Sequence, residues 1–168
     1  GYMDVLQAWQ AGFRNVVAQM GTALTPPQLN LLKRYTKRYV LALDADAAGQ
    51  KATMRGLQVA RETLDRESIS SFDARGLVQH EGRLKADIRI VTIPDGKDPD
   101  NIIAEDPTAW TALLETARPV VRYVIDMATA DLDMDDAKAK TAVAQQVIPL
   151  IKDIGEPVER DHYWQALA

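Results

Sequence analysis

The sequence contains no cysteine and only two histidines in 168 residues. Without cysteine, the chain can form neither a disulfide framework nor a metal site built on thiolates. No apolar run approaches the roughly 20 residues that cross a membrane, and no signal peptide is recognisable. We therefore expect a soluble cytoplasmic protein that does not bind a membrane.

An excess of positive charge is also absent, because the formal net charge is -4. A nucleic-acid-binding chain is more often basic, but this average conceals local differences of sign. The segment 33–38, KRYTKR, is basic, whereas the segment 94–107 is acidic. Hydrophobic residues make up 46% of the chain, which suffices for one core, or for one domain with an appended lobe.

Hydrophobic periodicity and turn residues predict an alternation of helices and strands before Pro99. The pattern is already under way in the first residues, GYMDVLQAWQ, so we expect a piece of a longer protein. Thr25 and Pro26 mark one helix start as N-cap and first helical residue. The expected helices here are 3–11, 26 to about 36 and 47–66, the expected strands are 15–21, 38–44 and 87–96, and 67–87 is irregular with a small hairpin around Glu81 and Gly82.

Only helices are expected after Pro99, and Pro149 should kink the fourth of them or end it early. The order of elements is typical of an α/β fold with a small parallel sheet flanked by helices, followed by an all-helical lobe. We place the boundary near residue 107, which gives an α/β unit and a helical unit. The predicted helices of this part are 99–105, 107–115, 118–130, about 135–153 and 156–167, and the two units are 1–106 and 107–168.

Pairs of aspartates follow two of the predicted strands. In the stretch LALDADAAG, Asp44 and Asp46 leave an extended chain on the same side. Asp98 and Asp100 follow the strand 87–96, and ligands of open parallel sheets bind beyond the carboxyl ends of the strands. Carboxylates gathered there would resist ionising together unless a cation offset their charge. Aspartate oxygens suit Mg²⁺ or Mn²⁺, so this pattern predicts a divalent metal site.

A simpler interpretation stays open for each acid. Asp46 and Asp98 stand where N-caps of the following helices would stand. The basic run 33–38 lies at a predicted helix C-terminus, where cations complement the helix dipole, although the run could instead contact phosphates. Lys51 and Arg55 share a helix face that could reach substrate phosphates or simply face solvent.

Four short motifs, in this order, are more specific than the acids alone: GYMD, GTALT, DADAAG and GKDPD. Together they resemble the Toprim part of bacterial DNA primases of the DnaG type. The C-terminal stretch IGEPVERDHYWQALA resembles the end of the same catalytic core. The resemblance implies a Toprim fold and a replication enzyme, a DNA-directed RNA polymerase that joins ribonucleoside triphosphates into short primers on single-stranded DNA.

The resemblance also implies roles for individual residues. The metal ligands would be Asp44, Asp46 and Asp98, with Mg²⁺ or Mn²⁺ as the cofactor, and Asp4 and Asp100 would complete the catalytic acids. Gly21 and Thr22 match the glycine loop that faces the site. Together with Lys51, whose helix face could reach substrate phosphates, they are the candidate cofactor-binding residues.

The family motif begins with a glutamate that would precede Gly1, and the strand that carries this glutamate would precede it too. We therefore expect a partial metal site and no activity of this chain by itself. The resemblance places the contact with the replicative helicase in parts outside this chain. Two alternatives remain open here: a Toprim nuclease or topoisomerase-like module that cleaves phosphodiesters, and a non-catalytic binding module whose acids only cap helices.

Overall fold

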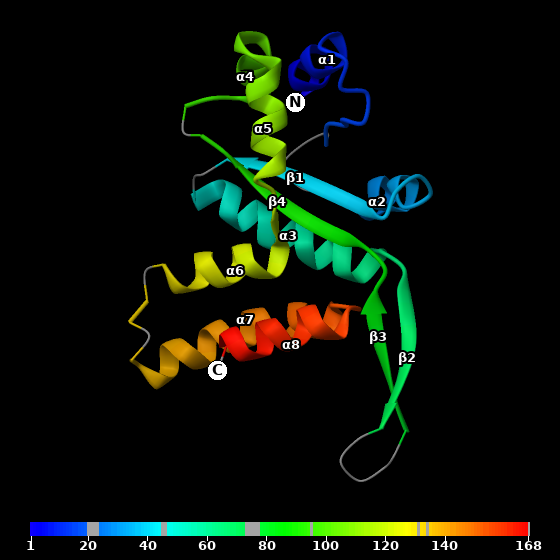
Figure 1. Ribbon diagram of the computed structural model, residues 1–168, viewed down its shortest axis with the longest axis vertical. Coiled ribbons are helices and arrows are strands. Elements are labelled where there is room, and N and C mark those ends of the chain that lie inside the picture. Colours follow the sequence, from blue (N-terminus) through cyan, green and yellow to red (C-terminus); the bar gives the residue numbers. More distant parts are fainter. Residues whose placement is uncertain are drawn as a thin grey trace. The chain divides into compact units, whose positions relative to one another are not determined.

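The structure is a computed structural model that describes residues 1–19, 24–44, 47–72, 78–94, 96–130, 132–133 and 135–167 (Figure 1). The chain divides into two compact units, each of which is described by itself. The first comprises Gly1–Thr63 and Ile88–Arg118, and the second comprises Leu64–Asp87 and Pro119–Ala168. In chain order the elements are α1 (Tyr2–Gln10), α2 (Pro26–Leu32), β1 (Arg38–Asp44), α3 (Ala47–Thr63), β2 (Arg66–Phe72), β3 (Val78–Leu84), β4 (Asp87–Ile93), α4 (Pro99–Glu105), α5 (Pro107–Glu115), β5 (Arg118–Pro119), α6 (Val120–Thr129), α7 (Ala137–Asp153) and α8 (Pro157–Leu167).

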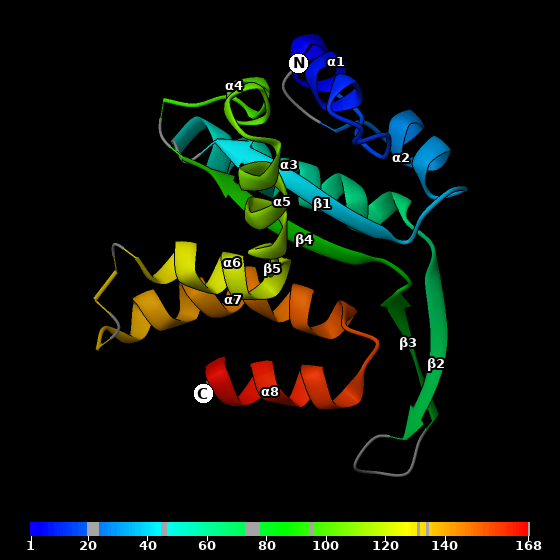
Figure 2. The ribbon, with the colours of Figure 1, turned by 45° about the horizontal axis from the view of Figure 1, so that its top comes forward.

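The first unit contains a three-stranded sheet in the order β1-β4-β5. The strands β1 and β4 run in the same direction, as Figure 2 shows, which is the parallel arrangement expected from the sequence. The central strand β4 carries buried side chains on both of its faces. A strand with this pattern is covered on both sides. Its buried residues are Ile88, Ile90, Val91 and Ile93.

A second cluster of buried side chains joins α1, α4 and α5 to the end of β4 in the same unit. Its members are Ala8, Ile93, Ile102, Ile103 and Trp110. The break between α4 and α5 follows from local sequence, because an aspartate and a proline occupy the N-cap and first helical positions of each helix.

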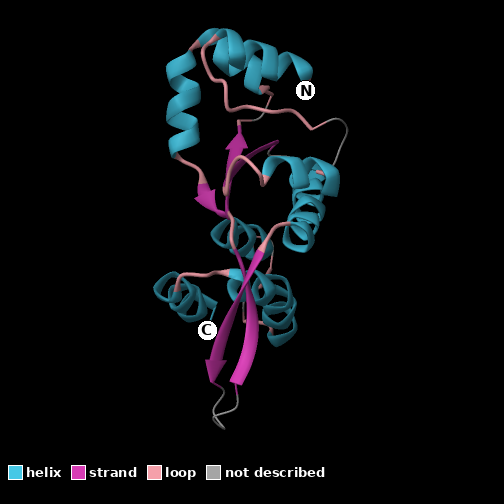
Figure 3. Ribbon diagram, turned by 90° about the vertical axis from the view of Figure 1, so that its right-hand side faces the viewer, coloured by secondary structure: helices cyan, strands magenta, loops and turns pink. Residues whose placement is uncertain are grey.

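The second unit consists of the antiparallel hairpin β2–β3 and the helices α6, α7 and α8. Figure 3 shows the hairpin as two long paired strands, whose register runs from Arg66 opposite Leu84 to Phe72 opposite Val78. The helices α6 and α7 each bury a stripe of apolar side chains, as amphipathic helices do, whereas Tyr163 is the buried residue of α8. The buried residues of these helices include Val121, Val124, Val143, Val147, Ile151 and Tyr163.

Polar contacts attach the hairpin to α7 within this unit. Nη1 of Arg66 donates to Oδ1 of Asp153 at 2.7 Å and to the carbonyl of Gly82 at 3.1 Å. The Arg83 guanidinium donates to the carbonyl of Lys152 at the end of the same helix. Because these contacts join segments far apart in sequence, they fix the hairpin against the C-terminal turn of α7.

Two expectations about local strands and turns are corrected. The predicted strand 15–21 is absent over 15–19. Val16, together with Phe13 just before this stretch, packs on the helical cluster around Trp110 instead of joining a sheet. Residues 20–21 lie outside the described residues. The turn predicted around Glu81 and Gly82 is wrong, because Gly82 pairs with Ser68 inside the hairpin. The hairpin reverses between β2 and β3, in residues that the structure does not describe.

Of the two effects predicted for Pro149, an early end of the helix is wrong, because α7 continues through it to Asp153, and a kink stays a prediction. A proline deprives the carbonyl four residues earlier of its partner, and that residue, Gln145, is exposed. The division into units differs from the boundary predicted near residue 107, since α5 belongs with the first unit and the hairpin with the second. Trp110 explains the first difference, because it is 3% exposed in the cluster with Ala8. No helix among the described residues is long and apolar enough to cross a membrane.

Candidate active site

The strands β1 and β4 bring two of the predicted acidic segments to one edge of the sheet. β1 ends at Asp44, and α3 begins three residues later at Ala47. β4 ends at Ile93, and the chain turns at Gly96, whose φ of 74° favours glycine, before Asp98 and α4. Because the two strands are neighbours and run in the same direction, both connections leave the same edge, where ligands of such sheets bind.

Asp4 and Asp100 lie together although they stand on different helices. The backbone N–H of Asp100, in the first turn of α4, donates to Oδ1 of Asp4 on α1 at 3.4 Å. The other carboxylate oxygen of Asp4 lies against the backbone nitrogen of Gly1. Oδ1 of Asp100 accepts from the N–H of Asn101 at 2.8 Å. One hydrogen bond, from the Asp100 backbone to the Asp4 carboxylate, therefore joins two of the predicted catalytic acids.

Asp98 caps α4, as the simpler interpretation of the sequence predicts. It forms a capping box with Asn101, whose side-chain oxygen accepts from the Asp98 N–H at 3.5 Å. The side chain of Asp98 is exposed, and its neighbour Lys97 pairs with Glu105 at the far end of the same helix. A carboxylate has several acceptor positions, so the cap leaves the metal-binding role of Asp98 as a prediction.

The remaining predicted residues are described only in part. Asp46, Gly21 and Thr22 lie outside the described residues, and for Asp44 and Lys51 the structure gives the backbone position alone, at the end of β1 and in α3. In the part of the chain that is described, no group of three or more histidine, cysteine, aspartate or glutamate side chains is gathered to hold a metal. The chemistry of the predicted donors, which are carboxylate oxygens throughout, fits a hard divalent cation.

Sequence reasoning missed Asn101, which completes the cap of α4. The signal was present in the sequence, since a polar residue three positions after an N-cap aspartate is the spacing of a capping box. A related cap starts α5, where Oδ1 of Asp106 accepts from the Thr108 N–H at 2.8 Å and from its hydroxyl at 2.7 Å. These bonds lower the pKa of Asp106 below its usual value.

Comparisons with known proteins agree with this arrangement. Residues 1–76 match a family described as Toprim-like, and residues 121–168 match one described as the DnaB-helicase binding domain of primase. The chain is 37% identical to a DNA primase of Clostridium acetobutylicum over 164 residues, which cover 97% of the chain and 24% of that protein. It is 30% identical to a DNA primase of Enterococcus faecalis over 170 residues, which cover 100% of the chain and 24% of that protein.

The solved structures that resemble this chain are also those of primases. A DnaG primase catalytic domain bound to single-stranded DNA superposes with a TM-score of 0.75 at 26% identity, covering 99% of this chain and 48% of the other. The chain belongs to the bacterial DnaG-type DNA primases. A primase domain from Pseudomonas aeruginosa gives a TM-score of 0.73 at 27% identity, covering 99% of this chain and 47% of the other.

The DnaG relationship confirms the predicted fold and identifies the chain as part of a primase catalytic core. It does not favour the alternative of a phosphodiester-cleaving module. The chain spans about a quarter of the length of the curated relatives and about half of the solved chains. The match to the helicase-binding family falls on α6, α7 and α8, inside this chain, whereas the sequence analysis placed the helicase contact outside it.

Proposed function

We propose that this chain supplies metal-binding acids to a primase that joins ribonucleoside triphosphates into short RNA primers on single-stranded DNA. One observation carries the proposal: the neighbouring strands β1 and β4 run in the same direction. The connections that carry Asp44 and Asp98 therefore start from one sheet edge. The hydrogen bond between Asp100 and Asp4 supports it, because it attaches α1 to the start of the helix that Asp98 caps.

The residues that would hold Mg²⁺ or Mn²⁺ are Asp44, Asp46 and Asp98. Held by these residues, the ion would supply the positive charge that lowers the pKa of an attacking hydroxyl and offsets the charge of a triphosphate. Asp4 would act as a positioning residue, because its carboxylate holds the backbone of Asp100 and so fixes the first turn of α4. Gly21, Thr22 and Lys51 would bind the triphosphate.

The partners are proposed from the relatives. Single-stranded DNA is the proposed template, since the structural relative with a TM-score of 0.75 is described as bound to it. The segment 121–168 matches the helicase-binding family, so we propose that α6, α7 and α8 contribute to binding a replicative helicase. The proposed place of action is the cytoplasm.

Binding of Mn²⁺ to the intact primase, followed by calorimetry, tests the metal site without requiring polymerisation. The variants are Asp44→Asn and Asp98→Asn, and the matched control is Asp161→Asn, an exposed aspartate on α8. Asparagine caps a helix as well as aspartate does, so Asp98→Asn keeps the start of α4 while it removes the charge.

We expect each site variant to weaken Mn²⁺ binding at least tenfold and to abolish primer synthesis, and the control to change neither. Unchanged Mn²⁺ affinity in both site variants would remove the metal site from these residues. Cleavage of DNA without any joining of ribonucleotides by the intact protein would contradict the polymerase assignment.

A further inference from the structure

The segment 33–38, called the basic turn below, connects α2 to β1 and concentrates positive charge. It reads KRYTKR, and the sequence contains no acidic residue anywhere between Asp4 and Asp44. This stretch therefore contrasts with a chain whose net charge is -4. A local excess of one sign attracts a partner of the opposite sign, whatever the average of the whole chain.

Hydrogen bonds fix the backbone of the basic turn. Oγ1 of Thr36 accepts from the Arg38 N–H at 3.0 Å and donates to the Arg38 carbonyl at 3.1 Å. The hydroxyl of Tyr39 donates to the Thr36 carbonyl at 2.9 Å. Nζ of Lys33 donates to the carbonyl of Thr63, the last residue of α3, at 3.4 Å. Lys33 thus has a structural role, and the turn is ordered before any partner binds.

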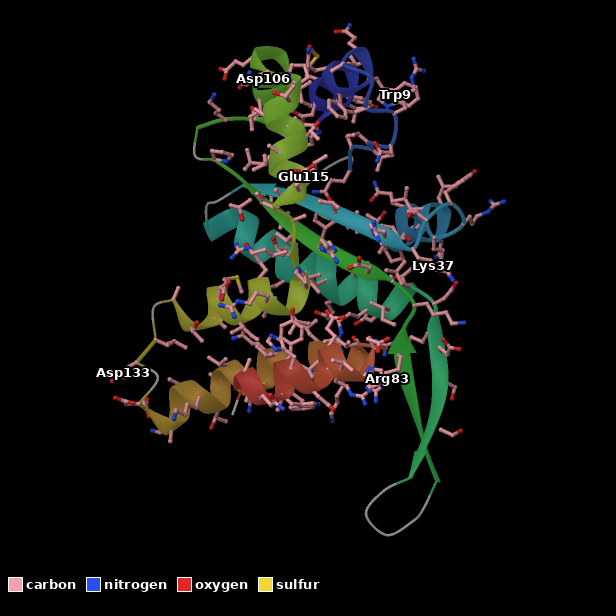
Figure 4. All side chains as sticks on the ribbon, viewed as in Figure 1. Trp9, Lys37, Arg83, Asp106, Glu115 and Asp133 are labelled. Atoms are coloured by element: carbon pink, nitrogen blue, oxygen red, sulfur yellow. The ribbon has the colours of Figure 1, made fainter. Side chains whose placement is uncertain are left out.

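Three side chains of the basic turn, those of Arg34, Tyr35 and Lys37, project into solvent. Tyr35 is 78% exposed, and Arg34 and Lys37 are exposed as well; Figure 4 labels Lys37 beside α2 and the start of β1. Among the described residues, none forms a hydrogen bond, an ion pair or a ring contact with these three side chains. The dipole of α2, which ends at Leu32, accounts for a cation at position 34, but it explains neither the later cation nor the exposed ring.

We propose that the basic turn is a binding site for single-stranded nucleic acid. Arg34 and Lys37 contact phosphates, and the ring of Tyr35 stacks on a base, which is the combination that such sites use. An acidic peptide would satisfy the cations but would leave the ring of Tyr35 without a function. This proposal rests on the proposed function in one respect: the class of ligand, single-stranded nucleic acid, is taken from it.

The position on β1 separates this site from the candidate metal site. Arg38 begins the strand and Asp44 ends it, and a strand advances about 3.3 Å per residue, so the two ends lie about 20 Å apart. The basic turn is therefore a second contact point for the single-stranded nucleic acid, at the end of β1 opposite to the acids.

Fluorescence anisotropy of labelled oligo(dT) with the intact primase, in EDTA, tests the proposal without metal or polymerisation. The variant Arg34→Ala/Lys37→Ala should weaken binding at least tenfold. The slope of log K against log salt should fall by about 1.4, because each phosphate contact on a single strand contributes about 0.7. The control Lys138→Ala/Lys140→Ala removes the same charge from exposed positions at the start of α7 and should leave the slope unchanged.

The aromatic contact is tested by Tyr35→Ala and Tyr35→Phe. Loss of one stacked base weakens binding about tenfold, so we expect this loss for alanine and near-normal binding for phenylalanine. Equal losses in the control pair and the basic-turn pair, or displacement of oligo(dT) by poly-glutamate at equal charge, would overturn the proposal. The variant Arg34→Ala/Lys37→Ala should bind Mn²⁺ normally, so failure of the metal site and failure of this site give different results.

Discussion

Asp4 accepts a hydrogen bond from the backbone N–H of Asp100 at 3.4 Å, although 96 positions separate the two residues in sequence. The bond joins the first turn of α1 to the first turn of α4. Because the acceptor is a side chain and the donor is backbone, substitution of Asp4 can separate its charge from its hydrogen bond.

The variant Asp4→Ala should lower the stability of the protein by about 1 kcal/mol, since it leaves the Asp100 N–H without its acceptor. The variant Asp4→Asn keeps an acceptor oxygen and should lose less stability. Thermal unfolding measures both effects. If the only role of Asp4 is to hold the backbone of Asp100, Asp4→Asn retains primer synthesis in the intact protein. A loss of synthesis at unchanged stability would show that the charge of Asp4 is required.

The ion pair of Arg66 and Asp153 should be the polar contact on which the second unit depends most. Asp153 is 8% exposed, and its Oδ1 lies 2.7 Å from the guanidinium. Asp153→Ala leaves a partly buried cation beside the hairpin, and we expect a cost of about 1–3 kcal/mol, reduced by the partial exposure of Arg66. Chemical denaturation measures it.

The surface pair of Arg122 and Asp126, at 2.9 Å within α6, is a matched control for that measurement. Such an exposed pair contributes about 0.3–0.5 kcal/mol, so Arg122→Ala should have a much smaller effect than Asp153→Ala. Equal costs for the two variants would show that burial of Asp153 contributes nothing.

The cap of α5 should make stability depend on pH. The hydrogen bonds from Thr108 lower the pKa of Asp106 in the folded protein below its ordinary value. The ionised cap therefore stabilises the fold above the ordinary pKa of an aspartate, and this contribution is lost as the pH falls through the lower pKa of the folded state. Asp106→Ala should lower the melting temperature at neutral pH, and the difference from the unsubstituted protein should shrink in acid.

Asp106→Asn separates the cap from its titration. Asparagine caps a helix about as well as aspartate but does not ionise, so this variant should keep most of the stability and lose part of the pH dependence. A gap between Asp106→Ala and the unsubstituted protein that stays constant down to strongly acidic pH would contradict the role of the ionised carboxylate.

Local signals made much of the fold predictable. The helices α4 and α5 have the predicted bounds, because Asp98 with Pro99 and Asp106 with Pro107 determine where each one starts. The strand β1 was predictable in the same way, from an apolar run that ends at Asp44. These elements depend on residues within a few positions of one another.

What the sequence did not reveal depends on contacts between distant residues. The stretch 15–19 has the composition of a strand, but Val16 packs on the helical cluster. The register of the hairpin places Gly82 opposite Ser68, which no local turn signal indicated. The site shows the same contrast: the acids were identified from their motifs, whereas the bond between Asp4 and Asp100 follows only from the packing of α1 against α4.

The last prediction concerns Trp110, whose buried ring stabilises the fold and whose unsatisfied N–H destabilises it. The ring is 3% exposed within the cluster of α1, α4 and α5. Within the described part of the chain, its Nε1 is buried without a hydrogen-bond acceptor, and a buried donor left unsatisfied costs about 1–3 kcal/mol. Trp110→Phe removes that donor together with part of the apolar surface.

We therefore expect Trp110→Phe to change the free energy of unfolding by no more than about 1 kcal/mol, because the two effects offset each other. Trp110→Ala removes the whole ring and should cost about 3–5 kcal/mol. Chemical denaturation of both variants checks the comparison. A cost for phenylalanine as large as that for alanine would mean that the indole N–H is satisfied in solution, since then its removal would relieve nothing.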